Sequence, residues 1–201
     1  MFTKTQQWLG VALIAGLLSA CGDEITSPSV SAQTTDNKTL ASVHQNRIIV
    51  SDQGVGPITG STRFNISDIT RAFPNYNVVR QLNFQEGNSY PKINVSKDTK
   101  TLLTINPTLD LTSIYSVVVE DNLITNSLHH RLGTLFSDIY TDGNFVCKPG
   151  TGEVSGKVVC RPPGAHNMLY LFTGKWSGPK GLLPPATILY SWALEAIVWK
   201  P

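Results

Sequence analysis

Charge of either sign is scarce in this sequence of 201 residues. Sixteen Lys and Arg stand against 14 Asp and Glu, which gives a formal net charge of +2. The longest basic cluster is His129-His130-Arg131, which is too small to make a positively charged surface that could bind a phosphate backbone. We therefore do not expect nucleic acid as a partner. With 41% hydrophobic residues, the chain can still bury the core of one globular domain.

Long apolar runs are also missing. The run from Trp8 to Leu18 is much shorter than the ~20 residues that span a bilayer. It follows a short segment with Lys4 and no acid, and small residues come after it, which is the order of a secretory signal peptide. We therefore predict that residues 1–20 are a signal peptide and not a transmembrane helix.

The end of this segment carries a more specific pattern. Leu18-Ser19-Ala20-Cys21 resembles the lipobox of bacterial lipoproteins, in which the cysteine thiol receives diacylglycerol before cleavage. The resemblance implies that Cys21 is lipidated and that its acyl chains anchor the mature protein. An ordinary secretory peptide with an incidental cysteine is the alternative. Enterobacterial-type lipoproteins that stay in the inner membrane have Asp after this cysteine. Gly22 stands there instead, so we expect the outer membrane, with the protein facing the periplasm.

Cysteine is rare, and its count is informative. Of three cysteines, Cys147 and Cys160 remain once Cys21 is lipidated, an even pair in an oxidising compartment. They lie in two β-prone runs on either side of residues 150–156, so they can face each other across a hairpin. We predict a disulfide that stabilises the domain by ~3 kcal/mol. A metal pair or redox centre is the alternative, but the sequence has no C-x-x-C.

Large apolar residues are nearly absent from residues 22–46, which are rich in Ser, Thr, Gln, Asn and Asp. Such a segment cannot bury enough surface to offset the entropy of ordering. We expect residues 21–46 to be a lipidated N-terminus and flexible tether with a span of roughly 25 to 30 Å. Residues 47–201 then form a single periplasmic domain.

The character of the chain changes from residue 47. Short β-branched or alternating runs predict strands at residues 47–50, 78–84, 92–95, 102–105, 114–119, 145–147, 158–160, 168–172 and 193–199. Two stretches, 65–73 and 134–140, look helical, and the first has a capping Asn65 and ends at Pro74. The fold class is therefore α+β, mainly antiparallel sheet with two short helices.

A weak internal repeat organises these elements. Residues 60–69 and 133–139 share a Gly, a Phe and a Ser-Asp-Ile, and strands follow each segment. The repeat predicts two half-domains, each a short helix followed by an antiparallel meander. Tandem halves of this kind are similar in outline to the β-lactamase inhibitor protein fold.

A further resemblance covers residues 50–201. It rests on Ser51-Asp52-Gln53-Gly54-Val55-Gly56, residues 133–140, the Cys147 and Cys160 pair, residues 170–184 (YLFTGKWSGPKGLLP), and the closing Trp192 with Ile197-Val198-Trp199. These motifs resemble the sigma-E-regulated lipoprotein family of enterobacteria and their relatives. The resemblance implies a small envelope lipoprotein whose expression follows outer-membrane stress, and it implies no catalytic residue.

Signals for catalysis are weak. Ser177 and Lys180 have the S-x-x-K spacing of penicillin-recognising enzymes, but they lie in a Gly- and Pro-rich loop without the companion motifs. His129 and His130 could ligate a metal, and surface histidines are the alternative. We expect a protein that is not an enzyme and has no cofactor, no metal site and no catalytic residue.

The remaining candidate for a site is the loop around Trp176. Its Gly and Pro content places it on the surface, where Trp176 between Lys175 and Lys180 suits a periplasmic protein or a cell-wall glycan. The alternative is that Trp176 folds back as a lid on the core. A non-catalytic lipoprotein that binds a partner under envelope stress is thus our first hypothesis, and a periplasmic inhibitor of a lysozyme or β-lactamase is the second.

Overall fold

The structure is a computed structural model that describes residues 47–201 except 86 and 180. The predicted signal peptide, Cys21 and the tether lie outside the described residues. The described chain forms an eight-stranded antiparallel sheet and a smaller four-stranded sheet. The helices among these residues are short, and none is long and apolar enough to span a membrane.

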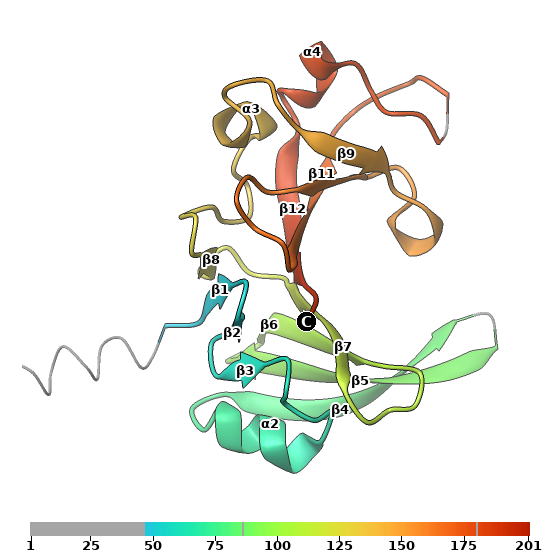
Figure 1. Cartoon of the computed structure of the whole chain (residues 1–201). Helices are drawn as coiled ribbons and strands as arrows, with labels where there is room; N and C mark the ends of the chain where they lie inside the picture. The colour runs from blue at the N-terminus through green and yellow to red at the C-terminus, as the bar shows by residue number, and fades with distance from the viewer. Residues whose placement is uncertain (1–46, 86, 180) are drawn as a thin grey trace, which may run out of the picture.

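The eight-stranded sheet is built from two consecutive segments of similar design. The first comprises α2 (Ile66–Ala72), β4 (Asn77–Gln85), β5 (Asn88–Lys97), β6 (Lys100–Pro107) and β7 (Ile114–Val119). The second comprises α3 (Phe136–Ile139), β9 (Val146–Pro149), β10 (Val158–Arg161), β11 (Met168–Thr173) and β12 (Ala193–Trp199). Figure 1 shows them as two lobes, with β4–β7 in one and β9–β12 in the other. Two helix-plus-meander halves and the α+β class are therefore confirmed.

The two lobes meet at one pair of strands. The order across the sheet is β4-β5-β6-β7-β12-β11-β10-β9, so the last strand of each half lies at the centre and the first lies at an edge. β7 and β12 are antiparallel, with Val117 opposite Trp199 and Val118 opposite Val198. The whole surface is thus one sheet without a break between the halves.

α2 forms where the sequence predicts it. The side chain of Asn65 accepts a hydrogen bond from the backbone N–H of Ser67 (2.8 Å), which satisfies one of the free donors of the first turn. Asp68 lies in that first turn and Arg71 in the last, both favourable for the helix dipole. Ile69 is fully buried, so the helix covers the core of the first lobe.

The smaller sheet was only partly predicted. It contains β1 (Ile49–Ser51), β2 (Gly54–Val55), β3 (Ile58–Thr59) and β8 (Thr125–Asn126) in the order β3-β2-β1-β8. Our sequence analysis predicted β1 alone, because β2, β3 and β8 have only two residues each and no readable alternation. At Gly54, a Cβ would lie 1.8 Å from the carbonyl oxygen of Ile58, so the tight β2–β3 pairing requires glycine.

The small sheet is fixed to the centre of the large one. The carboxylate of Asp52 accepts hydrogen bonds from the backbone N–H groups of His166 and Asn167 at 3.0 Å. Trp199 at the end of β12 donates from its indole N–H to the carbonyl of Asp52 (3.3 Å). The first turn of the domain is therefore bonded to its last strand.

The main core lies on one face of the large sheet. Alternate residues of the central strands point toward the helices and the small sheet, and Val117, Tyr170, Ile197 and Trp199 are almost fully buried there. The other face carries a separate, smaller apolar cluster of Val159, Leu171, Ala196 and Val198. An antiparallel sheet with one packed face leaves the second face available for binding.

Two short helical turns were not predicted. α4 (Ala186–Leu189) follows Pro184 and Pro185, and a 3-10 turn, η1 (Gly152–Val154), occupies the β9–β10 connection. Each is a single turn, too short to show a helical period in the sequence. The predicted count of two helices was therefore too low.

The predicted disulfide is confirmed. Cys147 and Cys160 are directly opposite in the β9–β10 pair, with their Cα atoms 4.1 Å apart and their sulfurs bonded. The bond closes a loop with a sequence separation of 13 residues. It clamps the edge hairpin of the second lobe.

Replacing both cysteines, Cys147→Ser with Cys160→Ser, should lower the free energy of unfolding by about 3 kcal/mol, because the unfolded chain loses a cross-link of this loop size. Urea denaturation followed by tryptophan fluorescence measures the difference. Wild-type protein reduced before unfolding is the control and should match the double variant. A loss below about 0.5 kcal/mol would contradict the stabilising role.

Candidate functional site

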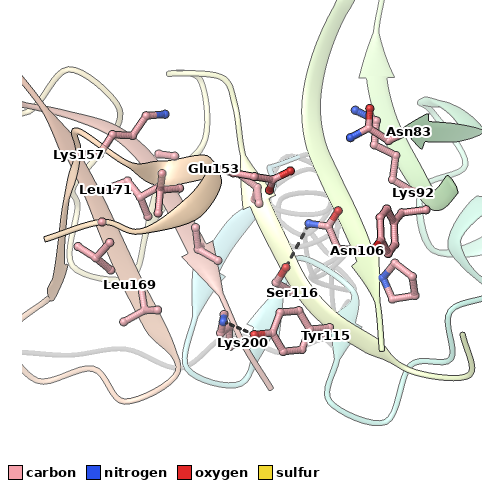
Figure 2. A pocket seen from close by; sticks show the side chains of 18 of the residues that line it. Asn83, Lys92, Asn106, Tyr115, Ser116, Glu153, Lys157, Leu169, Leu171 and Lys200 are labelled. Atoms are coloured by element: carbon pink, nitrogen blue, oxygen red, sulfur yellow. Dashed lines mark hydrogen bonds between the residues drawn. The ribbon is translucent and has the colours of Figure 1, made fainter. Parts of the chain in front are cut away.

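A large groove lies on the face of the large sheet that does not carry the main core. It has a volume of about 1080 Å³ and takes lining residues from both lobes. Figure 2 shows Leu169, Leu171 and Lys157 of the second lobe on one side and Asn83, Lys92 and Asn106 of the first lobe on the other. The groove therefore exists only because the two meanders share one sheet.

The second-lobe side of the groove is apolar. Cross-strand rows place Leu171 opposite both Val159 and Ala196, and Val198 opposite both Leu169 and Val118. Val154 in η1 packs against this cluster. These side chains form a continuous hydrophobic floor at the point where β12 meets β7.

The first-lobe side is polar and internally bonded. The amide of Asn94 donates to Gln81 Oε1 (3.1 Å), and the hydroxyl of Thr104 donates to Asn94 Oδ1 (3.1 Å). Asn106 donates from its amide to Ser116 Oγ (3.1 Å). All of these residues alternate with core residues and lie on the groove face of β4 to β7, and of them Asn106 and Ser116 line the groove itself.

Two strand irregularities bring additional polar groups into the groove. Pairing skips Tyr115 between β6 and β7 and Glu195 between β11 and β12, so each is the extra residue of a bulge. Tyr115 lies next to Lys200, whose ammonium donates to the phenol oxygen (2.8 Å) and lies 4.3 Å from the ring centroid. This hydrogen bond, together with the positive charge, lowers the pKa of Tyr115. Figure 2 shows the pair at one end of the groove.

The charges in the groove are balanced. Its lining includes four lysines and three glutamates: Lys92, Lys148, Lys157, Lys200, Glu120, Glu153 and Glu195. Lys157 and Glu195 form an ion pair at 2.8 Å. The groove therefore does not select a ligand by one sign of charge, and its lining suits a partner with both apolar and neutral polar groups.

An exposed apolar turn borders the groove between β6 and β7. Leu109 is 98% exposed, and Leu111 and Tyr90 close by are also exposed. The turn is held from within, because Thr112 donates to both carboxylate oxygens of Asp110 (3.2 and 2.9 Å). Hydrogen bonds from Thr108 and Thr112 lower the pKa of Asp110, so its carboxylate stays ionised at neutral pH.

This turn also holds backbone strain. Leu111 has φ of +60°, a conformation that costs a residue with a side chain of this size about 1 kcal/mol or more. Leu109 in the same turn is almost fully exposed. Together with Leu111 and Tyr90 it gives this end of the groove exposed apolar surface that a partner can cover.

The predicted loop around Trp176 is arranged differently from our first interpretation. Lys175 is exposed, Trp176 is half-buried and packs against the main core, and Lys180 lies outside the described residues. The contacts of Trp176 correspond to the alternative in which it covers the core. A second, smaller cavity of about 340 Å³ lies between Trp176 and Trp192.

The glycines of this loop serve close packing. A Cβ on Gly174 would lie 2.2 Å from Cδ1 of Trp192, and a Cβ on Gly178 would lie 2.1 Å from Cζ2 of Trp176. Each glycine thus lies directly against an indole ring. The same residues that indicated a surface loop in the sequence are required to bring the backbone against two tryptophans.

The sequence did not reveal one buried polar cluster. His130 Nδ1 lies 2.8 Å from the hydroxyl of Tyr170, and the amide of Asn126 also donates to that hydroxyl. Burial lowers the pKa of His130, and it raises the pKa of Tyr170. His129 next to it is exposed, and the described residues contain no group of three His, Cys, Asp or Glu that could hold a metal ion. This cluster connects β8 to β11.

Substitution of Gly174 should be far more damaging than substitution of Gly178. Gly174→Ala should lower the free energy of unfolding by about 2 to 3 kcal/mol, because the buried Trp192 cannot move away from the new methyl group. Gly178→Ala should cost less, since the half-buried Trp176 can swing outward. Gly152→Ala is the control, because nothing lies within 4 Å and only its φ of +58° is unfavourable. Equal losses from all three in thermal unfolding would contradict the packing role.

Known proteins are similar to this chain in sequence and in fold. The model of a family described as "Protein of unknown function (DUF1131)" matches residues 38–201. The chain is 31% identical over 152 residues to the "Uncharacterized protein YfeY" of Escherichia coli strain K12, a match that spans 75% of this chain and 78% of that protein.

A solved structure agrees with the sequence match. The crystal structure of the uncharacterized protein yfeY from Escherichia coli aligns with a TM-score of 0.61 and 30% identity, over 76% of this chain and 99% of that chain. Most of the described domain, including both lobes, therefore has a counterpart in an experimental structure. On the family match over residues 38–201, the chain belongs to the DUF1131 family.

Proposed function

We propose that this protein is a non-catalytic lipoprotein of the bacterial envelope, anchored through Cys21 in the outer membrane and facing the periplasm. Its domain binds a protein partner in the groove between the two lobes. The resemblance to the sigma-E-regulated lipoprotein family supports a link to outer-membrane stress. The alternative of a soluble secreted protein would require that Cys21 is not modified.

The N-terminal sequence and the disulfide support the location. Leu18-Ser19-Ala20-Cys21 has the lipobox pattern, and Gly22 rather than Asp follows the cysteine. The Cys147–Cys160 bond is of the kind that forms in an oxidising compartment such as the periplasm. A tether of about 25 residues leaves the domain free to meet a partner near the membrane surface.

The observation that carries the binding role is the groove itself. One wall is an apolar floor, the other carries polar side chains that include the hydrogen-bonded Asn106 and Ser116, and the exposed Leu109 turn borders it. An apolar floor with a few ordered polar groups is the usual composition of a binding site. Balanced charge and exposed apolar surface favour a protein segment over a phosphate-rich ligand.

We assign no catalytic residue to this groove. The hydroxyl of Ser116 is bonded to Asn106, the phenol of Tyr115 to Lys200, and Glu195 to Lys157. These polar groups of the described lining are therefore held in side-chain hydrogen bonds. We interpret the groove as a site that recognises shape and polarity.

An inhibitor of a periplasmic hydrolase is the second candidate. The two helix-plus-meander halves support it, because the β-lactamase inhibitor protein is similar in outline. The Leu109 turn adds an exposed carboxylate, Asp110, next to an apolar anchor. Such a loop could enter an active-site cleft. The identity of the bound partner separates the two candidates.

Cys21→Ala should release the protein from the membrane fraction, because a single cysteine carries all of the acyl chains that anchor it. Fractionation of cells and immunoblotting measure the change. Ser19→Ala is the control, since a small residue is kept at that position of the lipobox. If the Cys21→Ala protein still sediments with membranes to the wild-type extent, the lipid anchor is wrong.

A photo-crosslinking residue at Leu109 should trap a discrete partner in living cells, which mass spectrometry identifies. A crosslinker at Leu123 is the matched control, because it is an exposed leucine (70%) outside the groove lining. The adduct should fall at least fivefold when Leu169→Arg places a charge on the apolar floor. An adduct that forms equally from both positions, or persists with Leu169→Arg, would refute the groove. A hydrolase that is inhibited by the purified protein would identify the second candidate.

A further inference from the structure

The two edges of the large sheet are very different. β9 has four residues, contains Lys148 and Pro149, and is held to β10 by the disulfide. A short edge strand with a lysine and a proline resists pairing with other chains. β4 has nine residues, Asn77–Gln85, with no proline, no lysine and no bulge in its pairing with β5. Only one of the two edges is protected.

The outer side of β4 is open. Among the described residues, β5 is the only strand that pairs with β4. The exposed side chains of β4 include Val79, Leu82 and Phe84. Leu82 is 61% exposed and Phe84 72%. In Figure 1 the β4–β5 hairpin projects on the side of the molecule opposite the entry of the chain at β1. A long, unprotected edge strand with exposed apolar side chains is a template for another strand.

The sequence of β4 is compatible with itself in an antiparallel pair. Gln81 is its middle residue, and a twofold axis through Gln81 would pair all nine positions. On the face that bears the helix, Phe84 would then lie opposite Val78 and Leu82 opposite Arg80. On the groove face, Asn83 would lie opposite Val79 and Gln81 opposite its own copy.

No like charges meet in this arrangement. Arg80 is the only charged residue of β4, and its guanidinium lies 5.9 Å from the centroid of the Phe64 ring. Its aliphatic stem is therefore the part available to the leucine of the second copy. Like charges directly opposite would destabilise a strand pair, whereas apolar cross-strand pairs stabilise it.

We propose that two copies of this chain pair through their β4 edges, antiparallel about Gln81, and so form one continuous sixteen-stranded sheet. The main-chain N–H and C=O groups of the outer edge bond to those of the second copy, and Phe84 and Leu82 are covered. The two grooves then lie on the same face of the shared sheet. A single strand pair is small beside the roughly 1,600 Å² of a standard interface, so the dimer exchanges with the monomer.

Gln81→Cys in the full-length chain tests this pairing in the oxidising periplasm. Directly opposite residues in an antiparallel pair have Cα atoms about 4.5 to 5.5 Å apart, within the range of a disulfide. We expect a disulfide-linked dimer on a non-reducing gel. Asn83→Cys is the matched control, because it is on the same strand and face, yet its copies would lie roughly 14 Å apart. The dimer from position 81 should be at least tenfold more abundant.

A second measurement uses the chain without added cysteine. Protein extracted from membranes in detergent should sediment as a reversible dimer, and Leu82→Lys should shift it to monomer while the Cys147–Cys160 bond remains intact. Equal crosslinking from positions 81 and 83, or a wild-type monomer at all concentrations up to 100 times that in the crosslinking sample, would overturn the proposal. Capture of a different chain from position 81 would also overturn it, since another strand would then occupy the edge.

Discussion

The antiparallel pairing of β7 with β12 is the contact on which the rest of the domain depends. It is the only place in the described chain where the two meanders join within the large sheet, and its register sets the position of every other strand. Val118 and Val198 face each other on one side, and Val117 and Trp199 face each other on the other. The same pair thus contributes to the main core and to the floor of the groove.

The division of the sheet into two faces follows from this pairing. Because side chains alternate along each strand, a slip of one residue at β7–β12 would move the core residues of one lobe into the groove. The bulges at Tyr115 and Glu195 change the register locally and place one polar side chain each beside the hydrophobic floor. The composition of the groove is therefore determined by the pairing of the strands and by where it is interrupted.

Most of the secondary structure could be predicted from the sequence, and the groove could not. The long strands show an alternation of β-branched residues that predicts a strand, and Asn65 and Pro74 mark the two ends of α2. The placement of Cys147 and Cys160 on either side of a turn predicted their disulfide. Bulges leave no periodic signal, so nothing in the sequence placed Tyr115 or Glu195 in the groove. The buried contact of His130 with Tyr170 joins residues 40 positions apart, which a single sequence does not connect.

In the Trp176 loop the sequence carried a clear signal, but that signal had two possible explanations. Its glycines and prolines are typical of an exposed loop, and Lys175 is indeed exposed. The spacing of Gly174 and Gly178 instead reflects the contact of backbone with the two indole rings. Glycine enrichment had two physical explanations here, turn geometry and close packing. The positions of the Trp176 and Trp192 rings against these glycines show that close packing is the explanation here.

The position of β12 has a consequence for how the protein is made. β12 is the last strand in sequence and a central strand in the sheet, and its Trp199 is bonded to Asp52 at the start of the domain. Until β12 has been synthesised and released from the ribosome, the second lobe lacks its inner strand and β7 of the first lobe has no partner on that side. The large sheet can therefore be completed only after β12 has emerged.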